Sequence, residues 1–493
     1  MLAEFRDLHT RNALSADVVS RLCEEIATAV REPGATTSPA YRAAVTLLCE
    51  VATLEDETLG QIGRTALFSS LVEALSDSFS EDAANAYDRI FARVIDFCRR
   101  HRTGRELDAL LRRFAIEGED DLLRRRTRLR ERGRFVPAVP LRKAVVLSRV
   151  TVGADVAVTS VVLRKLETVF PGAEIVLLAP RQAREVFGAD PRIRVADLAY
   201  QRQGTLLGRL MAWPVLVAAL DRERQGLSGG ELVIVDPDSR FTQLGLLPVI
   251  EGDVGYCFFE SRTWSVPGVD TLGQLTSRWA DAIFGGTDQA LPLVRLDPGD
   301  VGRGERVVAA LRAGGASRIA AVNLGVGGND RKRISEEFER RLVEALLADG
   351  HTLVLDKGVG DEVERVDRIV TALRSAGRMV VEVTEPVLAT PGAGNLRCDV
   401  LTWQGGLGMF GALIGASDVY VGYDSAFQHI AAALEVPVVD IFANAPSPVF
   451  VERWTPFSRA PVSVVQAEGA AAGATVDLDR VLGEATAAAG RTP

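Results

Sequence analysis

The stretch that most constrains the fold of this chain is Asp418–Ala443, DVYVGYDSAFQHIAAALEVPVVDIFA. Val419–Gly422 is an apolar run of strand type, Ser425–Leu434 is rich in small apolar residues, and Pro437–Phe442 is strand-like again. A strand, a helix and a strand in such close succession predict one unit of a parallel α/β sheet. Ligands of these sheets bind beyond the carboxyl ends of the strands, so we expect a site at Tyr423-Asp424, where the first strand ends.

The pattern alone leaves two interpretations of the helix start at Ser425 open. The free N–H groups and the positive dipole end of a helix suit a phosphate. Alternatively, Ser425 and Gln428 form a capping box, Asp424 adds a second cap, and His429 is an ordinary polar residue of the first turn.

The segment VGYDSAFQHIAAALEVPVVDIFANAPSP, which begins at Val421, resembles the nucleotide-sugar signature of glycosyltransferase family 9, the heptosyltransferase-like enzymes. The resemblance lies in Asp424, Ser425, a His four positions later (His429), an Ala-rich helix and a Pro-led strand. Two glycines that are usual in the family are Ala426 and Ala443 here. The resemblance covers about residues 141–493 and implies that Asp424, Ser425, Ala426 and His429 bind a nucleotide-sugar donor.

Composition excludes several other classes of protein. A chain of 493 residues, nearly half of them apolar, predicts a globular protein of two or three domains. The net charge of −9 argues against nucleic acid as a partner. Five scattered cysteines without a CxxC pair indicate neither a disulfide framework nor a zinc site, and with four dispersed histidines we expect no metal. The N-terminus lacks an apolar signal core and no apolar run is long enough for a transmembrane segment, so we expect a cytoplasmic protein.

Periodicity divides the chain into three parts. Residues 1–135 contain helical patterns only and predict an appended all-α domain. Strands and helices alternate from residue 141 onward, and the alternation restarts after Asp297-Pro298-Gly299. We therefore predict two doubly wound, Rossmann-like domains at 141–290 and 300–493, which is an α/β GT-B architecture with a cleft between an acceptor domain and a donor domain.

Arginines crowd the chain between Arg99 and Arg134, with acidic residues among them. One interpretation is a basic rim that docks an anionic acceptor or a carrier protein. The other is a solvated helix face that leads into a linker. A carrier or protein partner at the N-terminal helices therefore stays open.

The turn after the first predicted strand, SRVTVGADVAVT, carries the candidate general base. Arg149, Asp155 and Thr159 fall on the family pattern, with Ala154 in place of a glycine, and the resemblance implies that Asp155 is the base. A carboxylate at a strand end that faces the cleft can take the proton of an acceptor hydroxyl. The competing interpretation is that Asp155 only caps its helix.

The second Rossmann-like domain opens with a glycine-rich turn, and its Gly325, Gly327 and Asn329 are candidates for donor binding. The following KRISEEF resembles a Lys-Arg-Trp-Pro-x-Glu stretch of the family, and Lys332 is then the cation on the donor diphosphate. A fixed ammonium there stabilises the leaving-group charge. A solvated first-turn lysine is the alternative.

One further segment is expected to contact the donor, and three arginines are expected to contact the acceptor. The resemblance places LTWQGGLGMFGALI in a loop that lines the nucleoside pocket, with Trp403 and Gln404 on the base and ribose and with Gly406 and Leu407 shaping the loop. Arg149, Arg181 and Arg240 are candidates for contacts with the acceptor.

These features together predict an inverting, metal-independent glycosyltransferase. It transfers a heptose-like or related sugar from an ADP- or GDP-linked donor to a hydroxyl of a glycolipid, glycan or natural product, and it needs no cofactor. Two alternatives are a sugar-nucleotide 2-epimerase of GT-B fold and a non-catalytic GT-B scaffold with a helical partner-binding domain.

Overall fold

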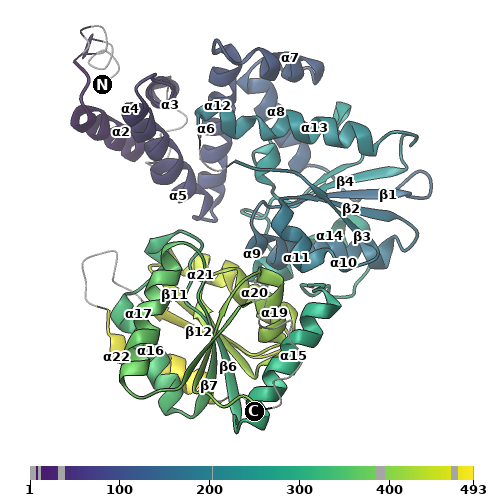
Figure 1. The fold of residues 1–493 in the computed structure, drawn as a ribbon. Helices are drawn as coiled ribbons and strands as arrows, with labels where there is room; N and C mark the ends of the chain where they lie inside the picture. Colours follow the sequence, from purple (N-terminus) through teal and green to yellow (C-terminus); the bar gives the residue numbers. More distant parts are fainter. Residues whose placement is uncertain are drawn as a thin grey trace.

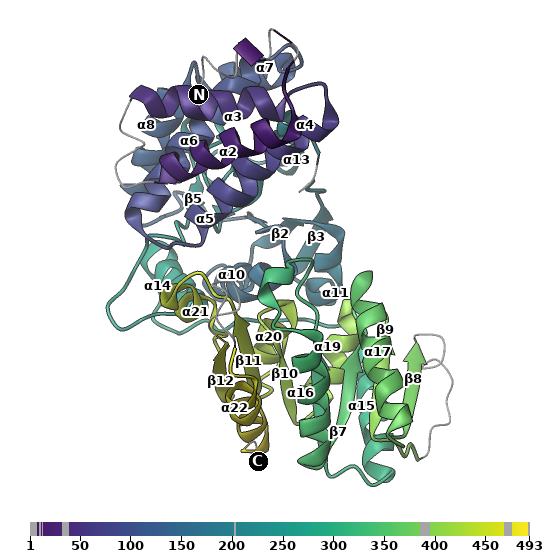
Figure 2. The ribbon, with the colours of Figure 1, turned by 90° about the vertical axis from the view of Figure 1, so that its left-hand side faces the viewer.

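The computed structural model describes residues 7–8, 11, 13–31, 39–201, 204–384, 395–467 and 476–491. The chain has two parallel sheets and an all-helical N-terminal region (Figure 1). Turned by 90°, the molecule shows the helical region at the top, the first sheet in the middle and the second sheet at the bottom (Figure 2). This is the predicted GT-B fold with N-terminal helices.

The first Rossmann-like domain, which was predicted to bind the acceptor and is called the acceptor domain below, is a five-stranded parallel sheet of order β3-β2-β1-β4-β5. The elements are β1 (Lys143–Leu147), α9 (Val152–Ala154), η3 (Asp155–Thr159), α10 (Ser160–Val169), β2 (Glu174–Ala179), η4 (Arg181–Ala183), α11 (Arg184–Phe187), β3 (Ile193–Asp197), α12 (Leu206–Leu210), α13 (Ala212–Glu223), β4 (Leu232–Asp236), η5 (Arg240–Thr242), η6 (Glu251–Asp253), β5 (Tyr256–Phe258) and α14 (Leu272–Phe284).

The second Rossmann-like domain, which was predicted to bind the donor and is called the donor domain below, is a seven-stranded parallel sheet of order β12-β11-β10-β6-β7-β9-β8. The predicted strand–helix–strand unit is β10, α20 and β11. The elements are α15 (Pro298–Ala313), β6 (Arg318–Asn323), η7 (Asp330–Lys332), α16 (Glu336–Ala348), β7 (His351–Asp356), α17 (Asp361–Ser375), β8 (Val380–Thr384), β9 (Val400–Gln404), α19 (Leu407–Ala416), β10 (Val419–Tyr423), α20 (Ala426–Ala433), β11 (Val438–Ala443), α21 (Pro448–Trp454), β12 (Val462–Ala467) and α22 (Leu478–Gly490).

One expectation in this domain is wrong. The stretch from Leu401 to Gln404 is not a loop but most of β9, and the loop shrinks to Gly405 and Gly406 before α19 begins. β9 pairs with both β7 and β8, which explains its apolar composition.

The N-terminal helices share one hydrophobic core with the acceptor sheet. Alternate residues of β1 point to opposite faces: Val145 and Leu147 join the cluster that contains Leu22 and Ile90 of the helical region. Val146 faces a second cluster under α10 and α14. The helical region therefore shares one continuous core with this face of the acceptor sheet and with α12 and α13 instead of forming a core of its own. Its helices are α2 (Ala16–Arg31), α3 (Pro39–Ala52), α4 (Glu57–Thr65), η2 (Ala66–Val72), α5 (Glu73–Ser76), α6 (Glu81–Arg100), α7 (Arg105–Arg113) and α8 (Glu119–Arg130).

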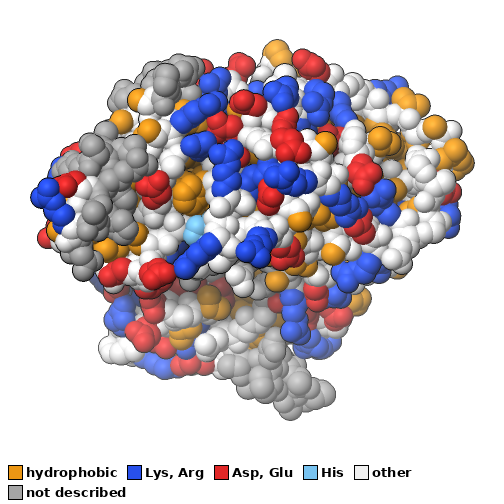
Figure 3. Space-filling model, turned by 90° about the horizontal axis from the view of Figure 1, so that it is seen from above, with side chains coloured by type: hydrophobic (Ala, Val, Ile, Leu, Met, Phe, Trp, Pro, Cys, Tyr) orange, Lys and Arg blue, Asp and Glu red, His pale blue; other side chains and the backbone are white. Residues whose placement is uncertain are grey.

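Arginines of α8 fasten the helical region to the acceptor domain. Arg125 is 2% exposed, donates from Nη2 to Asp253 Oδ1 at 2.6 Å and from Nη1 to the Leu246 carbonyl at 3.1 Å. Arg126 and Arg130 both contact Glu260. Seen from above, Lys and Arg side chains also gather across this face of the molecule with Asp and Glu among them (Figure 3). Several arginines of the predicted basic rim are thus internal ion-pair partners.

Replacing Arg125 with Ala is expected to lower the free energy of unfolding by about 3–5 kcal/mol, because Asp253 is left buried without its partner. Urea unfolding measures the loss. The matched control is Arg124→Ala, which removes an exposed arginine that pairs with Asp121 of the same helix and should cost less than about 1 kcal/mol. Similar losses for the two variants would contradict the fastening role of Arg125.

Among the described residues, no helix combines the length and apolar character needed to cross a bilayer.

Candidate active site

A row of polar groups lies at the carboxyl edge of the donor sheet, where β10, β6 and β7 are neighbours. Asn323 ends β6 and donates from Nδ2 to Asp356 Oδ2 at the end of β7, at 2.8 Å. The Ser425 hydroxyl, just after β10, donates to Asn323 Oδ1 at 3.4 Å. The strand order therefore brings together groups that are far apart in the sequence, at the edge where α/β sheets bind ligands.

The start of α20 lacks the capping box that was one interpretation of the sequence. Ser425 is the N-cap residue, but its side chain accepts no hydrogen bond from the helix. Gln428 is fully buried and donates from Nε2 to Asp424 Oδ1 at 3.0 Å. No side chain of the described residues caps the first turn, and Ser425 and Ala426 are partly exposed. The free N–H groups of this turn can therefore receive an anion.

Lys332 lies beside the start of α20. Its ammonium is 2.5 Å from Asp424 Oδ2, and its side chain is 31% exposed whereas that of Asp424 is 8% exposed. Lys332 Nζ also lies 5.9 Å from the centre of the Phe450 ring. The pair brings a partly exposed cation to the N-terminus of α20, where an anion would bind.

The glycine-rich turn before Lys332 is held by Glu362 of α17. Glu362 accepts from the Val326 N–H at 3.0 Å, and a Cβ on Gly325 would lie 2.8 Å from the Glu362 carboxylate. Gly327 has a φ of 61°, a conformation that favours glycine. Asn329 is exposed and caps η7 through the Arg331 N–H. The turn leaves Gly327 and Asn329 at the surface beside Lys332.

His429 is buried on α20 and neutral. Burial lowers its pKa to about 4, with Asp424 opposing this shift and Lys332 adding to it. Its ring centre lies 6.0 Å from that of Trp454, whose carbonyl faces Gln428. The imidazole thus contributes no positive charge to the site at neutral pH.

The residues predicted to line the nucleoside pocket divide into two groups. The Trp403 indole is fully buried in the core with Met409 and Phe410, so it packs the sheet instead of facing a base. Gln404 is exposed at the end of β9, and Gly406 is the N-cap of α19. Leu407 packs against the core of the acceptor domain.

Glu185 of α11, which sequence reasoning missed, connects the two Rossmann-like domains. It accepts from the Gly408 N–H at 3.0 Å. The carboxylate therefore accepts a hydrogen bond from one of the N–H groups that have no partner within the first turn of α19.

Asp155 does not face the cleft as expected. It is 1% exposed, and its carboxylate accepts from the Ser148 hydroxyl at 2.6 Å, the Arg149 N–H at 2.7 Å and the Thr159 hydroxyl at 2.7 Å. Burial raises its pKa to about 6. It begins the π-helical turn η3, while its neighbour Ala154 lines the cavity described below. In this structure Asp155 holds the end of β1 to the helix that follows.

The raised pKa of Asp155 predicts a specific pH dependence. The native state binds this proton more tightly than the unfolded state, so the contribution to stability is present at low pH and is lost as the pH rises toward 6. Asp155→Asn cannot titrate. Between pH 4.5 and 7 the difference in unfolding free energy between wild type and variant should change by about 2 kcal/mol, measured by urea unfolding. Parallel stability curves would contradict this environment for Asp155.

Three arginines meet in a cavity of about 110 Å³ at the carboxyl edge of the acceptor sheet. Arg149 follows β1, Arg240 follows β4, and Arg262 follows β5; the first two were predicted and Arg262 was missed. Burial lowers the pKa of Arg149 to about 10, so it remains charged at neutral pH. Arg181, the third predicted arginine, is exposed after β2, on the other side of β1, and does not line this cavity.

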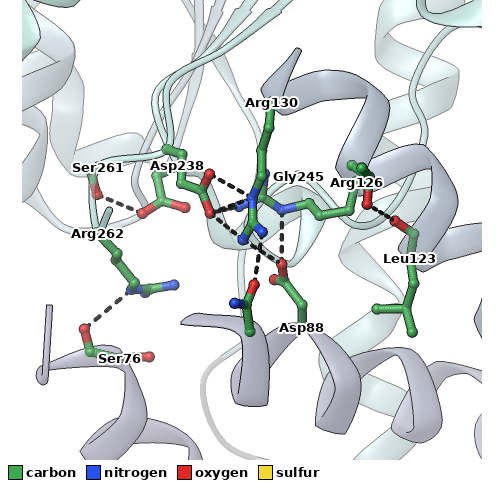
Figure 4. A network of polar contacts seen from close by, with 12 residues as sticks. Ser76, Asp88, Leu123, Arg126, Arg130, Asp238, Gly245, Ser261 and Arg262 are labelled. Atoms are coloured by element: carbon green, nitrogen blue, oxygen red, sulfur yellow. Dashed lines mark hydrogen bonds and ion pairs between the residues drawn. The ribbon is translucent and has the colours of Figure 1, made fainter. Parts of the chain in front are cut away.

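The charges of this cavity are only partly balanced. Asp238 is 2% exposed, accepts from the Ser261 hydroxyl at 2.6 Å and lies 3.8 Å from Arg149. Arg262 donates to the Ser76 carbonyl of the helical region at 3.2 Å, as Figure 4 shows. The Arg240 guanidinium has no hydrogen bond or ion pair with any residue that the structure describes. An unpaired guanidinium at a cavity wall favours an anionic ligand.

All three parts of the chain build this cavity. The helical region contributes Ser76, Asp77 and Phe79, and the donor domain contributes Trp454. Trp454 lies between this cavity and α20. Its ring is 6.0 Å from the Arg149 guanidinium, and its ring centre is 6.0 Å from that of His429. A larger cavity of about 830 Å³ lies along β5 and the linker at 133–136, and none of the predicted site residues lines it.

Comparison with known proteins agrees with the donor site. Residues 395–473 match the model of glycosyltransferase family 9 (heptosyltransferase). None of the curated proteins matches the sequence.

Similar solved structures include three glycosyltransferases. A family 9 glycosyl transferase from Veillonella parvula is 14% identical, with 67% of this chain and 88% of that chain covered and a TM-score of 0.48. ADP-heptose lipopolysaccharide heptosyltransferase II from E. coli is 16% identical (70% and 98% covered, TM-score 0.45). E. coli heptosyltransferase WaaC with ADP-2-deoxy-2-fluoro heptose is 16% identical (66% and 94%, TM-score 0.43).

The matched segment contains β9 to β11 with Asp424, Ser425 and His429. The predicted resemblance to glycosyltransferase family 9, the heptosyltransferase family, is therefore confirmed for residues 395–473.

Proposed function

We propose that this protein transfers a sugar, with inversion of configuration, from a nucleoside diphosphate donor to a hydroxyl of an anionic acceptor. The observation that carries the proposal is the placement of Lys332 and Asp424 at the uncapped start of α20. Across the cleft, the acceptor domain supplies a cavity with three arginines. The start of α20 therefore suits a leaving diphosphate, and the arginine cavity suits an anionic group of the acceptor.

The donor half of the proposal rests on charge. Breaking the bond between the sugar and the diphosphate places negative charge on the diphosphate, which the N–H groups of α20 and the Lys332 ammonium stabilise without a metal ion. His429 stays neutral because it is buried, so Lys332 is the cation at this position. Three exposed residues lie at the carboxyl ends of strands of the same sheet: Gln404 at the end of β9, and Gly327 and Asn329 after β6. They suit the ribose and base of an ADP- or GDP-linked sugar.

The proposed acceptor site has three arginines, Arg149, Arg240 and Arg262, against two carboxylates in the cavity lining, those of Asp77 and Asp238. A carboxylate or phosphate on the acceptor would neutralise the remaining positive charge, and Arg forms bidentate contacts with both groups. We infer an acceptor that carries such a group beside the reacting hydroxyl, on a glycolipid, a glycan or a natural product.

A two-stage measurement tests the proposal. In thermal-shift experiments with ADP, GDP, UDP and their sugars, one nucleotide series should raise the melting temperature by mass action. The selected sugar donor should then release its nucleoside diphosphate in the presence of the enzyme. Conversion of the sugar nucleotide to its 2-epimer without release would favour the epimerase, and binding without chemistry would favour the scaffold.

A further inference from the structure

The end of α5 and the residues after it connect the helical region to both Rossmann-like domains. The Ser76 carbonyl accepts from Arg262 of the acceptor domain at 3.2 Å (Figure 4). The Phe79 ring lies 6.4 Å from the Phe450 ring of the donor domain. Between these two anchors, Asp77 lines the arginine cavity. Part of the wall of the proposed acceptor site is therefore supplied by residues outside the two Rossmann-like domains.

Asp77 presents a carboxylate without a partner to this cavity. Its side chain is partly buried and has no hydrogen bond or ion pair with any residue that the structure describes. The Asp77 N–H donates to the Glu73 carbonyl at 3.0 Å, so α5 fixes the position of its backbone. The other carboxylate of the lining, that of Asp238, accepts from the Ser261 hydroxyl and lies 3.8 Å from Arg149. Because a partly buried carboxylate is costly without hydrogen bonds, Asp77 favours a ligand that donates one.

The charges around Asp77 indicate which kind of donor fits. Burial raises the pKa of Asp77, and three cations oppose this shift, namely Arg240, Arg262 and Lys332. A ligand ammonium beside Asp77 would be repelled by the same three cations. A hydroxyl carries no net charge and donates a strong, charge-assisted hydrogen bond to a carboxylate. The surroundings of Asp77 therefore favour a neutral hydroxyl over an ammonium.

Arg240 supplies the opposite chemistry in the same cavity. Its guanidinium, like the Asp77 carboxylate, has no hydrogen bond or ion pair with the part of the chain that the structure describes. One acidic group on the ligand can pair with Arg240, whereas an added ammonium would restore the excess of positive charge. The two unpaired side chains together suit a ligand that carries an acidic group and a hydroxyl.

We propose that Asp77 is a specificity-determining residue that binds a non-reacting hydroxyl of the acceptor, while Arg240 binds the acidic group of the acceptor. The assignment rests on the proposed glycosyl transfer. It concerns a hydroxyl other than the one that attacks the donor, so Asp77 takes no part in proton transfer. The acceptor is then a sugar or polyol with a free hydroxyl close to its acidic group, and the helical region selects it. A simple anion would leave Asp77 unpaired.

Three phosphates with a three-carbon chain test the assignment by calorimetric titration of the full chain. Glycerol 3-phosphate carries two hydroxyls, n-propyl phosphate carries none, and 3-aminopropyl phosphate carries an ammonium. Wild type should bind glycerol 3-phosphate with a Kd about tenfold lower than that of n-propyl phosphate, which leaves Asp77 without a partner. 3-Aminopropyl phosphate should bind no more tightly than n-propyl phosphate.

The ratio of the Kd values of n-propyl phosphate and glycerol 3-phosphate separates recognition from general electrostatics. Asp77→Ala removes a negative charge and should tighten the binding of every phosphate, but it should bring this ratio to within about threefold of one. Arg240→Gln should weaken both phosphates and keep the ratio, which places the phosphate in the arginine cavity. The matched control Glu73→Gln removes an exposed carboxylate of the same helix and should leave the ratio unchanged.

Several results would overturn the assignment of Asp77. They are a wild-type ratio near one, the wild-type ratio retained in Asp77→Ala, no binding of any of the three phosphates, and tightest binding of 3-aminopropyl phosphate. Nucleoside diphosphate release, measured on the same protein, tests the proposed function separately. Release with a failed ratio would contradict the role of Asp77 alone. The expected ratio in a protein that neither binds nor cleaves any nucleotide sugar would contradict glycosyl transfer and retain the hydroxyl site.

Discussion

Lys332→Ala is expected to lower kcat/KM for the sugar donor by about 100- to 1,000-fold. The reason is that Lys332 is the partly exposed cation at the start of α20, beside a histidine that burial keeps neutral. The effect should fall mainly on kcat, because leaving-group charge develops in the transition state. Steady-state release of the nucleoside diphosphate measures both constants.

The neighbouring Arg331 offers the matched control for Lys332. It is exposed, and Arg331→Ala removes the same charge one position earlier in η7. Its kcat/KM should stay within about threefold of wild type. Equal losses in the two variants would indicate a general electrostatic effect, and an unchanged rate in Lys332→Ala would remove Lys332 from the mechanism.

Deletion of residues 1–135 is expected to abolish folding of the acceptor domain. The deletion removes the helical part of the cluster that contains Val145 and Leu147, and it uncovers Trp213, whose ring centre lies 6.0 Å from that of Phe114. The free energy needed to expose apolar core residues of this kind exceeds the net free energy of unfolding of a typical domain. Solubility and cooperative urea unfolding measure the outcome.

The donor domain alone is the control for this deletion. Its two main clusters consist of its own residues, from Val307 to Ala489, so a fragment of residues 297–493 should fold and unfold cooperatively. A soluble 136–493 fragment with an intact, cooperative acceptor domain would show that the helices are an independent appendage and would contradict the shared core.

The sequence was most informative for the donor domain, where local patterns coincide with function. The run from Val419 to Phe442 specifies β10, α20 and β11 almost residue by residue, and the contact between Lys332 and Asp424 follows from the strand order that places β6 beside β10. The same information predicts the arginine cavity in part, since Arg149 and Arg240 both follow strands that are neighbours in the sheet.

Side-chain direction and tertiary packing could not be predicted in the same way. Each residue along a helix turns by about 100°, so a motif match to Asp155 does not decide whether its carboxylate faces the cleft or the core. Trp403 lies on the buried face of a strand whose partners, β7 and β8, lie outside the motif. Asp77 carries no local signal at all, because its place in the cleft depends on the packing of the helical region against the acceptor sheet.

The central claim is that α20 and Lys332 bind the donor diphosphate, and a crystal structure of the full chain with its nucleoside diphosphate tests it most directly. We expect phosphate oxygens within about 3.2 Å of the Ala426 or Phe427 N–H and of Lys332 Nζ. A diphosphate more than one helix turn, about 5.4 Å, from Ser425 would contradict the account.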